Sequence, residues 1–348
     1  MTSAPLQTVL VAVALDENAP ALIHMGATLC CRAGMRLKVV HAVGPTPAFH
    51  EGGAEGAALL GPELIRTIQT GALDGAAQRV RELVRIAGAE AVAEVVVVGG
   101  FALDAIVEQA KAATVGLIII GAGRRSQRVL LRGFSATISL LQDSPVPILV
   151  LPPGASIDFG KTSLRLLIAD DLRDDTARAI ERSLAWAVSI HATEVLQLHV
   201  SGMTEQTFIE RIEGAWRKTG SLGEMRPHEL WFLVRQTLVE RIEARAYDER
   251  RRLIDSGARC TVLSETGPIV GTIETHVNSF QPDLVLFGHH ERSHGRHIAR
   301  GQVPFHVMLG LERPIMSVPS PQPEVRKGRN RRLRFVRNDA PFEGHINA

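Results

Sequence analysis

The chain has 348 residues, enough for two domains of ordinary size, and its formal net charge of +2 favours no polyanionic partner such as nucleic acid. Hydrophobic residues make up 45% of the chain but aromatic residues only 4%, which predicts an aliphatic core like that of sheets buried by helices on both faces. Three cysteines provide neither a disulfide framework nor a paired metal spacing, which favours a reducing, cytoplasmic setting. No apolar run reaches the length of a signal peptide core or a membrane span.

Apolar runs alternate with helix-like segments through the first half of the chain. The predicted strands are Thr8–Ala14, Leu37–Val43, Ala93–Val98, Gly116–Ile120 and Pro147–Leu151. The predicted helices are Asn18–Gly34, Pro62–Gly88 and Leu103–Ala113. The segment Gly44–Gly61 is rich in Gly, Ala and Pro and is predicted to be a mobile loop. Strands that alternate with helices predict a parallel, doubly wound sheet.

The second half repeats this order. Its predicted strands are Arg165–Ala169, Val195–Val200, Arg259–Ser264, Leu284–Phe287 and Pro314–Val318. The offset between equivalent residues is 158 from His41 to His199 but 167 from Gly121 to Gly288, so an insertion of roughly ten residues lies between His199 and Gly288. We place this insertion near residues 201–227. One long helix, from His228 to Ser256, is predicted after it.

The predicted fold class is therefore α/β, with two doubly wound, five-stranded parallel sheets covered by helices on both faces, in tandem. The predicted domains are residues 1–153 and 164–320, with a linker at 154–163. Residues 321–348 are predicted to be a disordered tail that is rich in Lys and Arg. We expect this tail to be solvated rather than to bind nucleic acid.

A glycine-bearing loop follows the fourth strand of each half, where a doubly wound sheet binds its ligands. Glycine lets a phosphate approach the backbone, and the helix that follows offers its positive end. The first loop contains Gly121, Gly123, Arg124, Gly133 and Ser135. In the second half Gly288 and Gly301 take the corresponding places, and Asp170 ends the first strand. The two loops predict two phosphate-binding sites of one type.

The order of these segments resembles the universal stress protein family, here as a tandem over Thr8–Ser320. The resemblance rests on the start of the first strand, the LxxxHxV pattern of the second strand, the loop after the fourth strand and the segment SPVPILVLP. Nucleotide-binding members carry G-x2-G-x9-G followed by Ser or Thr, and an Asp at the end of the first strand that contacts the nucleoside. The resemblance thus implies a Rossmann-like fold that binds ATP or another adenine nucleotide, with Mg as the expected metal.

Both loops depart from that pattern. The first is one residue short of G-x2-G, and Ala14 stands where the strand-one Asp is expected. In the second, Glu291 replaces the second glycine and Gln302 replaces the Ser or Thr. A carboxylate at roughly 4 Å from a phosphate charge costs about 4 kcal/mol at an effective dielectric constant near 20. We therefore interpret both sites as degenerate, with Gly121, Gly123, Arg124, Gly133 and Ser135 in the first, and Asp170, Gly288 and Gly301 in the second.

Histidines are concentrated in the second loop. His289, His290 and His294 are candidate ligands for Zn or another transition metal, and a solvated loop without metal is the alternative. His41 and His199 occupy equivalent positions on the second strands, and we interpret them as buried, hydrogen-bonded core residues. No metal other than Mg with the nucleotide is expected.

The resemblance implies a non-enzymatic stress-response or regulatory protein that binds an adenine nucleotide in one half. A weak ATP-hydrolysing enzyme and a nucleotide-free scaffold acting through protein contacts are the alternatives. In the family the fifth strand is the pairing element, which here implies that Pro147–Leu151 and Pro314–Val318 join the two halves as an internal pseudo-dimer. An exposed edge strand needs a partner for its backbone groups, and further association with a second copy or another protein is open.

Overall fold

Five strands in each half of the chain alternate with helices. The computed structural model describes residues 7–44, 53–112, 114–121, 140, 144–219, 226–289 and 313–320. The strands of the first half are β1 (Thr8–Ala12), β2 (Arg36–Val43), β3 (Ala93–Gly99), β4 (Val115–Gly121) and β5 (Ile148–Leu151). The strands of the second half are β6 (Arg165–Asp170), β7 (Glu194–Ser201), β8 (Arg259–Thr266), β9 (Leu284–His289) and β10 (Ile315–Pro319).

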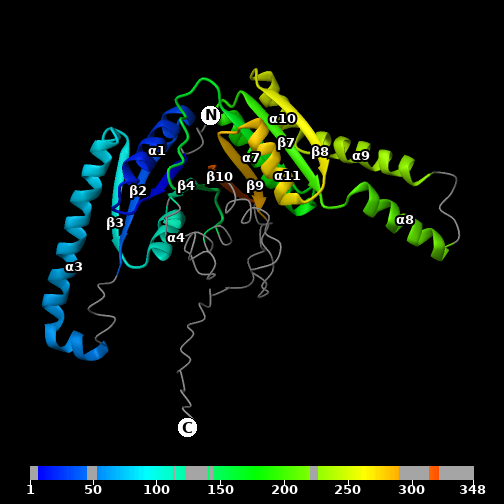
Figure 1. Ribbon diagram of the computed structural model, residues 1–348. Coiled ribbons are helices and arrows are strands. Elements are labelled where there is room, and N and C mark those ends of the chain that lie inside the picture. The colour runs from blue at the N-terminus through cyan, green and yellow to red at the C-terminus, as the bar shows by residue number, and fades with distance from the viewer. Residues whose placement is uncertain are drawn as a thin grey trace, which may run out of the picture.

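The ten strands form one sheet in the order β3-β2-β1-β4-β5-β10-β9-β6-β7-β8 (Figure 1). Neighbouring strands within each half pair in parallel. The first and fourth strands of each half lie side by side, which is the doubly wound order. The predicted α/β class with five-stranded parallel sheets is therefore confirmed.

An antiparallel pair, β5 with β10, joins the two predicted sheets into one. Ile315 lies opposite Val150 and Ser317 opposite Ile148, and every residue of both strands is buried. Left as free edges, these strands would leave backbone N–H and C=O groups without partners, and their pairing satisfies those groups. The pairing expected of Pro147–Leu151 and Pro314–Val318 is thus observed within the chain.

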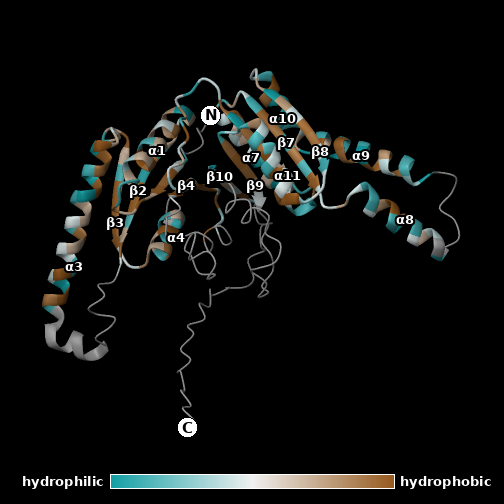
Figure 2. Cartoon of the chain, in the orientation of Figure 1, coloured by the Kyte–Doolittle hydropathy of each residue, from teal (hydrophilic) through white to brown (hydrophobic). Residues whose placement is uncertain are grey.

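Helices cover both faces of the sheet. They are α1 (Ala19–Ala33), α3 (Gly53–Ile86), α4 (Ala102–Ala112), α7 (Ala177–Ser189), α8 (Glu205–Thr219), α9 (Pro227–Ala244), α10 (Tyr247–Asp255) and α11 (Ile269–Phe280), with a short 3-10 turn, η1 (Asp174–Thr176). One apolar core packs α1, α3, α7 and α10 against one face, and two smaller cores include residues of α4 and α11. Figure 2 shows hydrophobic strands between helices of mixed polarity. Within the described ranges, no helix is long and apolar enough to cross a membrane.

Part of the segment between the two halves, residues 154–163, is packed into the core. Ile157 and Phe159 are buried and belong to the large core. The guanidinium group of Arg32, at the end of α1, donates to the carbonyl oxygens of Phe159 (2.8 Å), Lys161 (2.6 Å) and His191 (3.0 Å), and also to that of Ile190. One arginine of the first half therefore binds both the connecting segment and the end of α7.

Two predicted elements were wrong in their extent. Helix α3 begins at Gly53, so the predicted mobile loop is helical over 53–61. This segment is rich in Ala and Leu, whose helix propensity here outweighs that of its Gly residues. The single helix predicted from His228 to Ser256 is divided into α9 and α10, because Ala246 adopts a left-handed backbone conformation with φ 53°. The insertion predicted near residues 201–227 contains α8.

The two halves differ most in the connection from the second strand to the third. Among the described residues, this connection contains α3 in the first half and α8, α9 and α10 in the second half (Figure 1). Helices α8 and α9 form a hairpin that projects from the sheet, held by the Phe208 and Trp231 rings, whose centroids are 5.2 Å apart. Its base lies over β8, so the connection returns to the sheet through α10.

Candidate functional site

The candidate ligand sites lie where the first and fourth strands of each half end side by side. In the first half these are β1 and β4, and in the second half β6 and β9. Helices α1 and α7 follow the first strands and begin close to the ends of the fourth strands. Backbone N–H groups and the positive ends of helix dipoles gather at such a position, which makes it the expected place for an anionic ligand.

Gly121 is the last residue of β4 and Gly288 the last but one of β9, and helix packing alone explains both glycines. A Cβ atom on Gly288 would lie 3.3 Å from Ala179 Cβ and 3.4 Å from Thr176 Cβ, at the start of α7. A Cβ atom on Gly121 would lie 3.1 Å from Leu22 Cδ1 on α1. Both glycines are therefore needed, or favoured, by the close approach of a helix to the strand. Their presence does not require a phosphate.

The remaining predicted loop residues lie outside the described part of the chain. They are Gly123, Arg124, Gly133 and Ser135 in the first loop, and Gly301, His290 and His294 in the second. His289 ends β9, and its side chain is likewise not described. Their proposed contacts with phosphate or metal stay predictions from the sequence. Within the described residues, no group of three or more His, Cys, Asp or Glu side chains could hold a metal ion.

Asp170 is buried at the end of β6, with 3% of its surface exposed, and its carboxylate is already bound from three directions. Oδ1 accepts hydrogen bonds from the backbone N–H of Leu172 (2.8 Å) and from Arg245 Nη1 (2.9 Å). Oδ2 accepts one from Gln197 Nε2 (3.0 Å). The side chain predicted to contact a nucleoside is therefore engaged by protein groups on both oxygens.

Arg245 comes from the end of α9, in the connection that distinguishes the second half. Besides its ion pair with Asp170, it donates to the carbonyl oxygen of Arg173 and to Thr176 Oγ1 (3.4 Å). Arg241, one helical turn earlier, reaches the carbonyl oxygen of Leu172 (3.4 Å). The guanidinium group thus lies against the start of α7, where a negatively charged ligand would be expected. A ligand that approaches Asp170 has to displace it.

A second buried arginine fixes the end of α9 in this position. Arg250, with 7% of its surface exposed, donates to Gln197 Oε1 (2.7 Å) and to the carbonyl oxygens of Ile242 (2.6 Å), Glu243 (2.5 Å) and Arg245 (2.9 Å). A positive charge at the C-terminal end of a helix is favourable, because the unpaired carbonyl groups there carry partial negative charge. Asp170, Gln197 and the two arginines therefore form one continuous buried network.

The first half has no such network in its described residues. Val13 occupies the register of Asp170, because His41 Nδ1 contacts the carbonyl oxygen of Val13 (2.9 Å) as His199 Nδ1 contacts that of Asp170 (2.8 Å). The position is thus filled by Val13, which is buried, and not by Ala14 as the sequence suggested. His199 is buried and hydrogen-bonded as predicted, and His41 makes the same bond while half-buried.

Asp170, His199 and Ser264 share one register across β6, β7 and β8, which invites comparison with a hydrolase triad. The contacts do not support it. The histidine binds the backbone carbonyl of Asp170 rather than its carboxylate, and Ser264 Oγ is buried without a hydrogen-bond partner among the described residues. A nucleophilic serine needs a base within hydrogen-bond reach. These residues therefore serve the packing of the sheet.

Two of the three thiols, those of Cys30 and Cys260, are unsuited to nucleophilic chemistry. Burial, with a smaller contribution from Cys31, raises the pKa of Cys30 to about 12, and burial also raises the pKa of Cys260. A thiol is nucleophilic only as the thiolate, so both are unreactive near neutral pH.

Comparison with known proteins assigns the first half to a family. Residues 5–152 match the model of the Universal stress protein family, so the first half is a universal stress protein domain. The match includes the whole loop from Gly121 to Ser135. No curated protein matches the sequence significantly.

Solved structures extend the similarity of fold over both halves. A universal stress protein from Archaeoglobus fulgidus DSM 4304 is 18% identical with a TM-score of 0.57, covering 90% of this chain and 96% of that one. A putative universal stress protein from Pseudomonas aeruginosa UCBPP-PA14 is 16% identical with a TM-score of 0.52, covering 91% of this chain and 94% of that one. At these identities the similarity concerns the fold.

Proposed function

We propose that the chain is a non-enzymatic, cytoplasmic regulatory protein of the universal stress type that binds an adenine nucleotide in its first half only. In this proposal the second half is a closed site. The observation that carries it is the contrast between Asp170, which is held by Arg245, and the apolar Val13, which has no charged group against it among the described residues. The tandem of two such domains is part of the same proposal.

In the first half, no arginine side chain is hydrogen-bonded at the end of β1 among the described residues, in contrast to Arg245 at the end of β6. The loop after β4 carries the groups that suit a nucleotide. Gly123 and Gly133 would offer backbone N–H groups to phosphate, Arg124 a positive charge and Ser135 a hydroxyl. A bound nucleotide would bring Mg with its phosphates, which the protein need not hold by side chains of its own.

The second half is closed at the same place by two features. Arg245 neutralises Asp170 and occupies its side of the site, and Glu291 adds negative charge to the loop where phosphates would lie. The energetic cost of opening this half includes leaving Asp170 buried and unpaired. Removing one partner of a buried ion pair typically costs about 3–5 kcal/mol.

One experiment distinguishes nucleotide binding from the two alternative functions, a nucleotide-free scaffold and an ATP-hydrolysing enzyme. The chain is purified under mild conditions, denatured with acid, and the supernatant is resolved by ion exchange. We expect an adenine nucleotide at up to one molecule per chain. A nucleotide-free supernatant, together with no binding of added ATP, would favour the scaffold. ATP turnover, measured as release of inorganic phosphate above that of a mock preparation, would favour the enzyme.

A further inference from the structure

The outward side of α9 combines apolar and acidic side chains. Six residues at three- and four-residue spacing share this side, and we call them the acidic–apolar stripe: Glu229, Phe232, Leu233, Gln236, Glu240 and Glu243. All six are exposed, Phe232 by 69% and Leu233 by 42%. The opposite side of the helix carries Trp231 and Ile242, which are buried in the fold. Packing of the hairpin therefore leaves this stripe without an apolar partner among the described residues.

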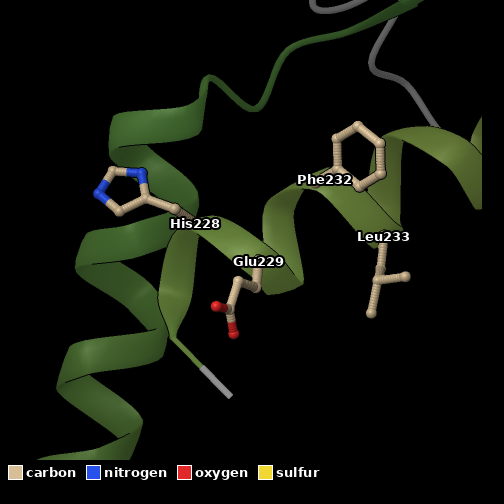
Figure 3. Close-up of a pocket in the computed structure, with 4 residues that line it drawn as sticks. All are labelled: His228, Glu229, Phe232 and Leu233. Atoms are coloured by element: carbon tan, nitrogen blue, oxygen red, sulfur yellow. The ribbon is translucent and has the colours of Figure 1, made fainter.

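Four neighbouring residues line a shallow depression at the start of α9: His228, Glu229, Phe232 and Leu233. Figure 3 shows Glu229 and Leu233 projecting along one edge of this side of the helix and Phe232 along the other edge. His228 contacts Glu205 of α8 at 2.9 Å, and Glu229 accepts a hydrogen bond from the backbone N–H of Arg226 (3.0 Å) while its side chain stays exposed at the start of α9. Exposed aromatic and aliphatic side chains between carboxylates fit a partner that is both apolar and basic.

The chain itself contains a segment of that chemistry, Arg331–Arg337, with the sequence RRLRFVR. In an extended conformation, alternate side chains share one side, so Arg331, Leu333, Phe335 and Arg337 face together. This order places two apolar residues between two positive charges. Arg331 and Arg337 would be roughly 20 Å apart in an extended chain, and Glu229 and Glu240 are roughly 17 Å apart along a helix.

The tail leaves the fold close to the end of α9. Ser320 Oγ donates to the carbonyl oxygen of Asp175 (2.5 Å), and Arg245, which directly follows α9, contacts Thr176 Oγ1 (3.4 Å) in the same short turn. From there Phe232 lies about 20 Å away along the helix axis. The fifteen residues from Pro321 to Phe335 can span up to about 50 Å, so the segment reaches the stripe with chain to spare.

We propose that Arg331–Arg337 docks on the acidic–apolar stripe of the same chain. Leu333 and Phe335 cover Phe232 and Leu233. The tail runs from the end of α9 toward its start, which sets Arg331 near Glu240 and Arg337 near Glu229. The surface is thus a binding site for a basic, apolar peptide, and the chain supplies its own occupant.

Trypsin tests the proposal on the full chain, because it cleaves after the arginines of the tail. If the tail is docked for about 90% of the time, cleavage between Arg326 and Arg337 is about tenfold slower than in a synthetic peptide of the same sequence. Phe232→Asp and Glu240→Arg should each raise the rate toward that of the peptide. Glu181→Lys on the exposed side of α7 is the control for added positive charge and should leave the rate unchanged.

Exchanging the charges of the proposed ion pair between Arg331 and Glu240 tests that contact directly. Arg331→Glu combined with Glu240→Arg should restore slow cleavage after Arg334 and Arg337, measured by mass spectrometry. Equal rates in the wild type, Phe232→Asp and the free peptide would overturn the proposal. Protection that disappears on dilution would assign the tail to a second copy, and protection that requires added RNA would assign it to nucleic acid. Either result would also overturn it.

Discussion

The ends of β1 and β6 occupy equivalent places in the two halves, yet their chemistry is opposite. At the end of β1 the chain has Val13, an apolar residue that needs no partner. At the end of β6 it has Asp170, whose buried charge is neutralised by Arg245 and bonded by Gln197. The comparison teaches that the position of a carboxylate does not by itself assign it to a ligand, because protein groups already bind both oxygens of Asp170.

The connections after the second strands explain how this difference arises. Among the described residues of the first half, no side chain of α3 (Gly53–Ile86) is hydrogen-bonded at the end of β1. The three helices α8, α9 and α10 return over β8 and turn sharply at Ala246, which brings Arg245 and Arg250 to the end of β6. We therefore regard the insertion as the element that converts a possible ligand site into a buried ion-pair network.

Replacing Arg245 gives the largest expected effect on this comparison. Arg245→Ala leaves the carboxylate of Asp170 buried without its counter-charge, and we expect the free energy of unfolding to fall by about 3–5 kcal/mol. Urea denaturation measures this change. Arg235→Ala, on the exposed part of the same helix, is the matched control and should change stability by no more than about 0.5 kcal/mol.

A double variant shows whether the loss belongs to the pair. Asp170→Ala with Arg245→Ala should be more stable than the sum of the two single losses predicts, by about 1–3 kcal/mol. Additive losses would mean that the two residues act separately, and the comparison between the halves would lose its physical basis.

The glycines near the ends of the fourth strands, Gly121 and Gly288, offer a smaller test. Gly288→Ala places a methyl group against the Cβ atoms of Ala179 in α7 and Thr176 in η1, which cannot move without shifting the backbone, and we expect the free energy of unfolding to fall by about 1–3 kcal/mol. Gly121→Ala meets only the flexible end of Leu22, so its loss should be about 1 kcal/mol or less. Thermal unfolding of the two variants measures the difference. A larger loss for Gly121→Ala would show that the first loop, rather than helix packing, fixes its glycine.

Much of the fold could be predicted because it depends on local patterns. Each predicted strand begins and ends within two residues of the observed strand, since buried parallel strands read as continuous runs of Val, Ile and Leu. The pairing of β5 with β10 followed from the resemblance and from the need to satisfy an edge. The start of α3 was missed because Gly and Pro in 44–61 predicted a loop more strongly than Ala and Leu predicted a helix.

The candidate site was less predictable because its contacts are distant in sequence. Arg245 is 75 residues from Asp170, and only the sharp turn at Ala246 brings the two together. No local pattern marks an alanine for a left-handed conformation, which an L-residue rarely adopts. The one available signal was the insertion itself, whose arginines lie in a segment that has no counterpart in the first half. That Val13 is the equivalent of Asp170 could likewise be recognised only from the structure, where His41 binds the carbonyl oxygen of Val13.

The central claim is that the first half binds an adenine nucleotide and the second half does not. Gly133 and Gly301 hold the same place in their loops, so Gly133→Asp and Gly301→Asp form a matched pair whose ATP affinity can be measured by isothermal titration calorimetry. We predict that Gly133→Asp weakens binding by at least about 100-fold, because a like-charge contact near 4 Å costs about 4 kcal/mol. Gly301→Asp should bind as the wild type does. Loss of binding in Gly301→Asp with binding kept in Gly133→Asp would contradict the account.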